Sequence, residues 1–470
     1  MYFSDRVAAD RPINADVPER DESEETAPSL PEEPKKAPAD QPQEPKPPRG
    51  PRVPGALLLI GGLVVVAIGF IVLVLVAGSG GGPDDESSSS GPGPAPVVVT
   101  EEAPNEDGEE ETPAAESSES LGYPAFATDN TTRVGGATAA ENAAAVALAV
   151  FPSITPAQRP AAVALVAEDD WLAAIAAAVL MAPPVRVPLL FSGPESTPEA
   201  SEEALAALDP QGSKATSGAR GFAFGAALVP DSLAGIESIR GGGAGEAEDP
   251  AAIAATIADL RDRLFGSPPK AIVLAPLSEP SFAAPAAAWA ARSGDPVLFA
   301  ETDALPKATE DALKKHAKVP VYVLGPASAI ADAVIAEVKG LGNPVQRVAG
   351  DDPVTNALAF ARYNGDGFGW NVNDPGHGFV LARDDSPLEA AAAAPLSAAG
   401  TWGPLLLTDS AGTLPPEVRS YLLDVKPGYT TNPTRAYYNH VWVIGDQEAI
   451  DVKQQAEANE LAELAKIGEG

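Results

Sequence analysis

Three arginines with glycines beside them are the residues of this sequence best suited to bind an anion. Arg133 lies in TTRVGG, Arg240 in SIRGGG and Arg347 in QRVAGD, and an Ala-rich segment follows each motif. A guanidinium presents donors in a plane that matches phosphate or carboxylate oxygens, and glycines before a helix leave backbone N–H groups open to an anion. The predicted ligand-binding residues in these motifs are Arg133, Gly135, Gly136, Arg240, Gly242, Gly243, Arg347 and Gly350. The alternative is that each arginine is an ion-pair clamp between repeated modules.

Two hydroxyl side chains at predicted strand ends are further candidates. Ser192 and Thr408 end the segments PLLFS and PLLLT. In an open α/β sheet, ligands bind beyond the carboxyl ends of the strands, so both hydroxyls are positioned to contact a sugar. Each could equally cap the helix that follows.

Paired carboxylates and histidines give no clear catalytic or metal signal. Asp169–Asp170 and Asp384–Asp385 suit a metal or acid–base role, but they precede predicted helices, where the helix dipole favours acids. His316, His377 and His440 share no metal-ligand spacing, and His316 is expected at the surface in the charged segment LKKHAK. No known catalytic motif occurs. We predict a protein without enzyme activity, cofactor or metal.

One loop is a candidate for sugar contacts. The segment PGYTTNPTRAYYNH, residues 427–440, holds several tyrosines and His440. Such a loop either presents aromatic rings to a sugar or packs on a neighbouring module.

The elements that position these residues recur along the chain. Arg133, Arg240 and Arg347 are 107 residues apart, and Pro188, Pro296 and Pro404 are 108 apart. Each repeat contains four continuous apolar runs separated by helix-like segments, a pattern typical of parallel strands that are buried on both faces. We predict an α/β fold with three tandem doubly wound modules at 128–235, 236–343 and 344–470, the last with a C-terminal helix.

The repeats resemble the cell wall-binding repeat type 2 family, which occurs as triplets in bacterial surface proteins. The opening strand is matched by TRVGG and QRVAG, the third strand by PLLLTD, and the fourth by VWVIGDQEAI, over about residues 128–460. The resemblance implies three modules packed around a pseudo-threefold axis. It also implies that the triplet binds an anionic polymer of the cell wall.

The sequence before the repeats predicts a membrane anchor between two disordered segments. Residues 1–54 contain 12 acidic and 8 basic residues with many prolines, and residues 78–127 are rich in Gly, Ser, Pro and acids, so neither segment can form a core. Residues 55–77 carry no charge and are long enough to cross a bilayer of about 30 Å as a helix. Basic residues precede this span and acids follow it, which predicts a cytoplasmic N-terminus and an exported C-terminal part.

Composition limits the partners of the exported part. From Leu121 onward the chain has 23 basic and 42 acidic residues, a balance of −19, so nucleic acid is a poor partner. The chain has no cysteine, so its fold depends on an apolar core. We predict a single-pass membrane protein of the bacterial envelope that binds a wall glycopolymer without catalysis. The alternatives are a scaffold whose Pro-rich tail binds cytoplasmic proteins and, less favoured, an envelope hydrolase.

The charge asymmetry around the apolar span makes the topology testable. External protease added to spheroplasts should degrade residues 121–470 and leave a short membrane-bound fragment, because only the C-terminal part is exported. Immunoblotting with antibodies against each end would follow both parts. Protection of the C-terminal part would contradict the predicted orientation.

Overall fold

The structure is a computed structural model that describes residues 126–127, 129–241 and 249–467. The predicted tail, the predicted membrane span and all but the last residues of the predicted linker lie outside these ranges. Within them, no helix is both long enough and apolar enough to cross a membrane.

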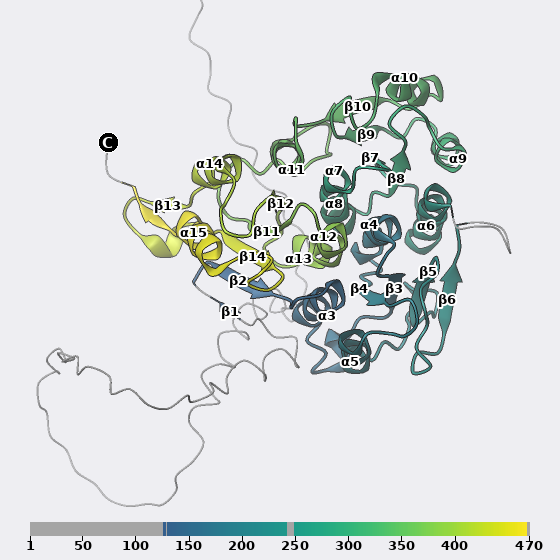
Figure 1. The fold of residues 1–470 in the computed structure, drawn as a ribbon, viewed down its shortest axis with the longest axis horizontal. Coiled ribbons are helices and arrows are strands. Elements are labelled where there is room, and N and C mark those ends of the chain that lie inside the picture. The colour runs from purple at the N-terminus through teal and green to yellow at the C-terminus, as the bar shows by residue number, and fades with distance from the viewer. Residues whose placement is uncertain (1–125, 128, 242–248, 468–470) are drawn as a thin grey trace, which may run out of the picture. The chain divides into compact units, whose positions relative to one another are not determined.

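The described chain builds three sheets of parallel strands (Figure 1). The first sheet has the order β4 (Leu189–Ser192), β3 (Val163–Ala167), β5 (Gly221–Phe224), β6 (Ile236–Ile239). The second has the order β8 (Val297–Ala300), β7 (Ile272–Pro276), β9 (Val321–Leu324), β10 (Val345–Val348). The third has the order β12 (Leu405–Thr408), β11 (Gly378–Arg383), β14 (His440–Ile444), β2 (Thr131–Val134), and the antiparallel strand β1 (Phe126–Ala127) lies outside β2. Strands β3, β4, β7, β8, β11 and β12 are buried at almost every position, as the continuous apolar runs predicted.

Each sheet combines strands from two sequence repeats. Strands β6 and β10 open the second and third repeats, yet they pair with β5 and β9 of the preceding sheets. Strand β2 opens the first repeat and pairs with β14 in the last sheet, so the two ends of the described chain lie side by side in Figure 1. The repeats and the sheets are therefore offset by one strand. A sequence period gives the length of a module but not the point at which the module begins.

Short Ala-rich helices join the three sheets. They follow β3, β7 and β11, the central strands, and comprise α4 (Trp171–Ala177) with the 3₁₀ turn η2 (Ala178–Met181), α7 (Pro280–Ala283) with α8 (Pro285–Ser293), and α12 (Pro387–Ala392) with α13 (Ala394–Ala398). Helix α12 packs on α4, and α8 packs on both α13 and η2, so the helices of each sheet touch those of the other two. Alanines such as Ala174, Ala287 and Ala391 are at most 1% exposed. Small side chains let these helix axes approach closely, which accounts for the unusual alanine content.

The remaining helices pack beside the other strands of the sheets. They are α3 (Ala139–Val150) and α5 (Glu199–Leu208) in the first sheet, α6 (Pro250–Phe265), α9 (Lys307–Lys315) and α10 (Asp332–Gly340) in the second, and α11 (Pro353–Arg362), α14 (Pro416–Asp424) and α15 (Val452–Ala462) in the third. The first sheet has no counterpart of α10 and α15, because residues 225–235 connect β5 to β6 without a helix. Smaller elements are the turns η1 (Pro156–Gln158) and η3 (Pro433–Arg435) and the strand pair β13 (Gly428–Tyr429) and β15 (Ala465–Lys466).

Two polar residues considered in the sequence hold helices in place. Asp170 is the N-cap of α4, where its carboxylate accepts from the N–H of Ala173 at 2.9 Å, as expected of an acid at a helix start. His316 was expected at the surface, but it is only 5% exposed. Its Nε2 lies 2.6 Å from Asp262 Oδ2 and its Nδ1 lies 2.8 Å from the carbonyl oxygen of Ala312, so it joins α6 to the end of α9.

Candidate functional site

The guanidinium of Arg133 is used inside the fold. Arg133 is 2% exposed, and its Nη1 donates to the carbonyl oxygens of Gly445 and Asp446 at 2.9 and 2.5 Å. Its Nη2 donates to the carbonyl of Ile450 at 2.5 Å, and its Nε donates to Gln455 Oε1 at 3.1 Å. Burial lowers the pKa of Arg133, and the nearby acids Asp446 and Asp451 oppose that shift. Arg133 therefore joins β2, at the N-terminal end of the described chain, to the loop that follows β14.

Arg347 makes the same contacts in the second sheet. Its Nη1 donates to the carbonyl of Gly325 at 2.7 Å, and its Nη2 donates to the carbonyl of Ile330 at 2.7 Å. Gly325 and Ile330 follow β9 just as Gly445 and Ile450 follow β14. Arg347 also forms an ion pair with Asp332 at 3.0 Å, and its side chain is 20% exposed. The sequence suggested an ion-pair clamp as the alternative to a ligand role, and the clamp in the structure is made mainly to backbone carbonyls.

Arg240 does not occupy the equivalent place, although its spacing along the chain predicted that it would. Arg133 lies opposite Val443 of β14, and Arg347 lies opposite Val323 of β9. In the first sheet the position with the same register is Ser238, which lies opposite Ala223 of β5. Arg240 comes after the end of β6 and is exposed. Gly242 and Gly243 lie outside the described residues. The three arginines thus belong to three different sheets, and the fold does not gather them into one basic cleft.

Buried asparagines occupy backbone N–H groups that were expected to receive an anion. The N–H of Gly136 donates to Asn142 Oδ1 at 2.8 Å, and the N–H of Gly350 donates to Asn356 Oδ1 at 3.3 Å. Both asparagines are fully buried. Gly135 has φ +117°, and a Cβ there would lie 1.9 Å from Asn142 Oδ1, so only glycine fits this turn.

The two candidate hydroxyls are also buried and internally bonded. Ser192 Oγ accepts from the N–H of Leu228 at 3.0 Å. Thr408 Oγ1 donates to the carbonyl of Ser410 at 3.0 Å and accepts from Gln454 Nε2 at 2.6 Å. Both residues are 0% exposed. Neither hydroxyl caps the next helix and neither faces solvent, so neither residue is accessible to a ligand.

A buried carboxyl group lies at the carboxyl end of the third sheet. Glu389 lies in the first turn of α12, and its Oε2 is buried with no hydrogen-bond partner among the described residues. A Cβ on Gly445 would lie 4.0 Å from this oxygen, which places it beside the end of β14. Burial, and then the charges of Asp385 and Asp446, raise the pKa of Glu389 to about 7, while Asn142 and Arg383 oppose the rise.

Aromatic and cationic side chains, three of them exposed and two half-buried, lie near the amino end of β11, away from these buried groups. Arg292 lies with its guanidinium carbon 4.5 Å from the ring centre of Trp402, and the Trp402 ring is 5.1 Å from that of His377. Tyr437 lies against the backbone of Gly376, the residue before His377. Tyr437 is 73% exposed and Tyr438 is 51% exposed. We call Arg292, His377, Trp402, Tyr437 and Tyr438 the aromatic strip.

Hydrogen bonds and a ring contact anchor the segments that carry the aromatic strip. Asn439 is buried, and its Oδ1 accepts from the N–H of Gly376 at 2.8 Å while its Nδ2 donates to the carbonyl of Val425 at 2.8 Å. The hydroxyl of Tyr438 donates to the carbonyl of Pro433 at 2.8 Å. Trp402 stacks on the buried ring of Trp370, with ring centres 6.2 Å apart. Within the described residues, Arg292 forms no ion pair, so its charge is available to a ligand.

The fold is shared with two solved structures. The chain is similar to Cwp6 and to Cwp8, both from Clostridium difficile, with TM-scores of 0.54 and 0.52 and 17% sequence identity in each case. Each comparison covers 71% of this chain, which spans about half of either protein, 48% of Cwp6 and 52% of Cwp8. No family model matches the sequence, and no curated protein matches it. The similarity is therefore one of fold.

The sequence pointed to only part of the aromatic strip. The loop at 427–440 was recognised as a possible sugar-stacking surface, and it supplies Tyr437 and Tyr438. Arg292, His377 and Trp402 were missed. An available signal was the difference in length between repeats: six residues, 266–271, join α6 to β7, whereas the Gly- and aromatic-rich segment 363–377 joins α11 to β11.

The carbonyl clamp predicts a large loss of stability when Arg133 is replaced. In Arg133→Leu, the carbonyls of Gly445, Asp446 and Ile450 lose a charged donor, and we expect the free energy of unfolding to fall by about 3 kcal/mol or more. Urea denaturation followed by circular dichroism measures this loss. The control is Arg240→Leu, an exposed arginine from the same sequence motif, which should change stability by less than about 1 kcal/mol. Equal effects of the two substitutions would contradict the clamp.

Glu389 predicts a stability that falls as pH rises. Its pKa in the folded chain is about 7 against an ordinary value of 4.5, so the folded state binds this proton more tightly than the unfolded state does. Stability should therefore decrease between about pH 4.5 and 7, and the full penalty should remain above that range. Glu389→Gln should be more stable than the parent at pH 8 by up to about 3 kcal/mol and nearly equal to it at pH 4. Urea midpoints across this range measure the difference, and a difference that does not change with pH would contradict the assignment.

Proposed function

We propose that this protein is a non-catalytic component of the bacterial cell wall region and that its aromatic strip binds an anionic glycopolymer of the wall. The observation that carries the proposal is the exposure of Tyr437 and Tyr438 on the same strip as Trp402, a half-buried ring in contact with Arg292. Arg292 is exposed and forms no ion pair with any residue that the structure describes. The fold shared with Cwp6 and Cwp8, together with the motif resemblance to cell wall-binding repeats, supports a location at the wall.

The chemistry of the strip suits a charged sugar chain. Aromatic rings offer flat apolar faces on which the C–H groups of a sugar can stack. Arg292 remains a cation on the face of Trp402 and can pair with a phosphate or carboxylate on the polymer. Asn439 and Trp370 hold the surrounding loops in place, so little side-chain entropy is lost on binding.

The net charge from Leu121 onward explains why binding needs a local site of short-range contacts. A balance of −19 repels a polyanion at long range. Short-range stacking and one or more local cations must outweigh that repulsion. Added salt screens both the repulsion and the arginine contact, whereas stacking persists, so binding through the strip should weaken only partly with salt. Chelators should have no effect, because the strip contains no metal-dependent contact.

The predicted membrane span would give the protein a second attachment. If the residues between the predicted span at 55–77 and the first described strand form a linker, a coil of about 50 residues would have a dimension of roughly 35–40 Å and could extend much further. The described unit could then bind polymer within the wall while the span stays in the membrane. The membrane-anchored arrangement belongs to the proposal.

The assay is cosedimentation of the purified protein with wall sacculi, before and after the anionic polymer is stripped from them. The parent should sediment with intact sacculi and lose most of its binding to stripped ones. The double variant Tyr437→Ala with Tyr438→Ala, and separately Arg292→Glu, should each weaken binding about tenfold, because exposed anchor residues contribute most of the affinity in such sites.

Matched controls come from the first module. Arg186 is exposed and lies 5.5 Å over the ring of Phe151, so Arg186→Glu makes the same charge change at another arginine–aromatic contact. Ile154 is 65% exposed, and Ile154→Ala removes an exposed apolar side chain elsewhere. Both controls should bind sacculi like the parent. Normal binding by the strip variants, or equal binding to stripped sacculi, would contradict the proposal.

A further inference from the structure

Strand β10 ends the second sheet with backbone groups that face outward. The N–H of Val321 donates to the carbonyl of Pro344, and the N–H of Gly325 donates to the carbonyl of Val348, at 2.8 and 3.1 Å. The backbone groups of successive residues in a strand point alternately to its two sides. The N–H and C=O groups of Val345 and Arg347 therefore point away from β9, toward an edge of the sheet that no described strand covers.

The equivalent edge in the third sheet already pairs with another strand. Arg133 corresponds to Arg347, and it lies opposite Phe126 in the antiparallel pair of β2 with β1. Strand β2 keeps its arginine clamp while its outer side pairs with β1. The same strand geometry at β10 is thus compatible with an antiparallel neighbour.

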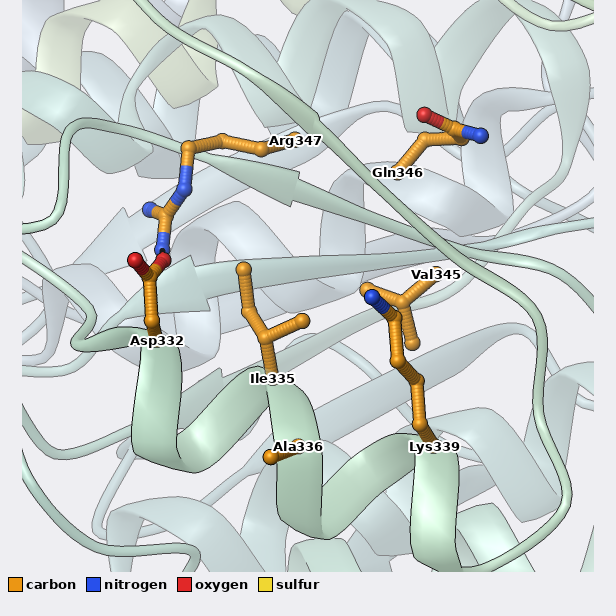
Figure 2. Close-up of a pocket in the computed structure, with 7 residues that line it drawn as sticks. All are labelled: Asp332, Ile335, Ala336, Lys339, Val345, Gln346 and Arg347. Carbon is orange, nitrogen blue, oxygen red and sulfur yellow. Dashed lines mark hydrogen bonds and ion pairs between the residues drawn. The ribbon is translucent and has the colours of Figure 1, made fainter.

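A groove beside β10 has opposite charges at its two ends. The groove has a volume of about 400 Å³ and lies between β10 and α10 (Figure 2). Asp332 lies beside Arg347 at one end, and Lys339 lies near Val345 at the other. The apolar side chains of Ile335 and Val345 lie between them. Lys339 is exposed and forms no ion pair within the described ranges.

We propose that the occupant of this edge is β10 of a second copy of the chain, related by a twofold axis. Antiparallel pairing in which the outward groups of Val345 face those of Arg347 in the partner copy satisfies four backbone groups on each strand. The twofold axis also turns the groove of the second copy end for end relative to that of the first, so that Lys339 of one copy lies beside Asp332 of the other. A self-complementary charge pattern of this kind favours a second copy over an unrelated peptide.

The pairing fixes the residue on the twofold axis. If Val345 faces Arg347 of the other copy, Gln346 must face its own counterpart. This is a non-hydrogen-bonded pair, in which Cα atoms are about 4.5 Å apart, a separation that a disulfide can bridge. The two sheets then form one continuous sheet with the α10 helices on the same face. The inference is independent of glycopolymer binding, although a dimer would present two aromatic strips to one polymer.

The absence of cysteine in the natural chain gives a direct test. Gln346→Cys, in the full chain purified with a mild detergent, should form a disulfide-linked dimer under gentle oxidation at low micromolar concentration. Ser238→Cys is the matched control, because Ser238 is an exposed residue on β6, the open edge of the first sheet. Non-reducing electrophoresis should show several-fold more dimer for Gln346→Cys. Equal cross-linking of both variants, or none in either, would overturn the proposal.

A second measurement separates this contact from association through the predicted membrane span. Lys339→Glu should raise the dimer dissociation constant about fivefold in sedimentation equilibrium, since it replaces two symmetric attractive contacts by repulsive ones. Lys339→Arg keeps the charge and should leave the constant nearly unchanged. Both substitutions are at an exposed helix position, so the fold should be retained. An unchanged constant in Lys339→Glu would overturn the proposal even if the chain is dimeric.

Discussion

Strand β2 and the guanidinium of Arg133 hold the two ends of the described chain in one sheet, and the closure of the third module depends on this contact. Residues 131–134 pair with residues 441–444, more than 300 positions later. Arg133 adds charged hydrogen bonds to the loop after β14, and these are shielded from water because the side chain is 2% exposed. Such a buried arginine is stable only while its carbonyl partners stay in place. The first and last modules must therefore form together.

The Ala-rich helices explain how three small sheets become one described unit. An isolated four-stranded sheet covered by a few helices buries limited apolar surface for its size. Here α4, α8 and α12 each face helices of the other modules rather than solvent. Alanine contributes little buried surface per residue, but it loses no side-chain entropy and allows close backbone contact. Many short contacts of this kind replace the large side chains that a single core would use.

Much of the architecture could be predicted from the sequence, because burial on both faces imposes continuous apolar strands and the repeat imposes their number. The phase of the modules could not be predicted, since strand pairing across a repeat boundary leaves no local signal. Arg240 shows a second limit: it keeps the 107-residue spacing, yet it lies two residues beyond the position of Ser238, where the clamp would be. His316 shows a third, because its charged neighbours suggested the surface while its ring packs against Asp262. In each case a contact distant in sequence decided the outcome.

Residues that the repeats share serve the fold, and residues that only one repeat carries form the candidate site. The matched pairs Arg133 and Arg347, and Asn142 and Asn356, all bond to backbone groups within the described unit. A side chain that every module needs for its own closure has no donors left for a ligand. The aromatic strip instead includes His377, from the segment 363–377, and Tyr437 and Tyr438, from the loop before β14. Two of its rings are more than half exposed because no module requires them for closure. Internal symmetry therefore separates the two roles: a side chain present in more than one module was selected by packing, and an exposed aromatic group present in one module is free to serve binding.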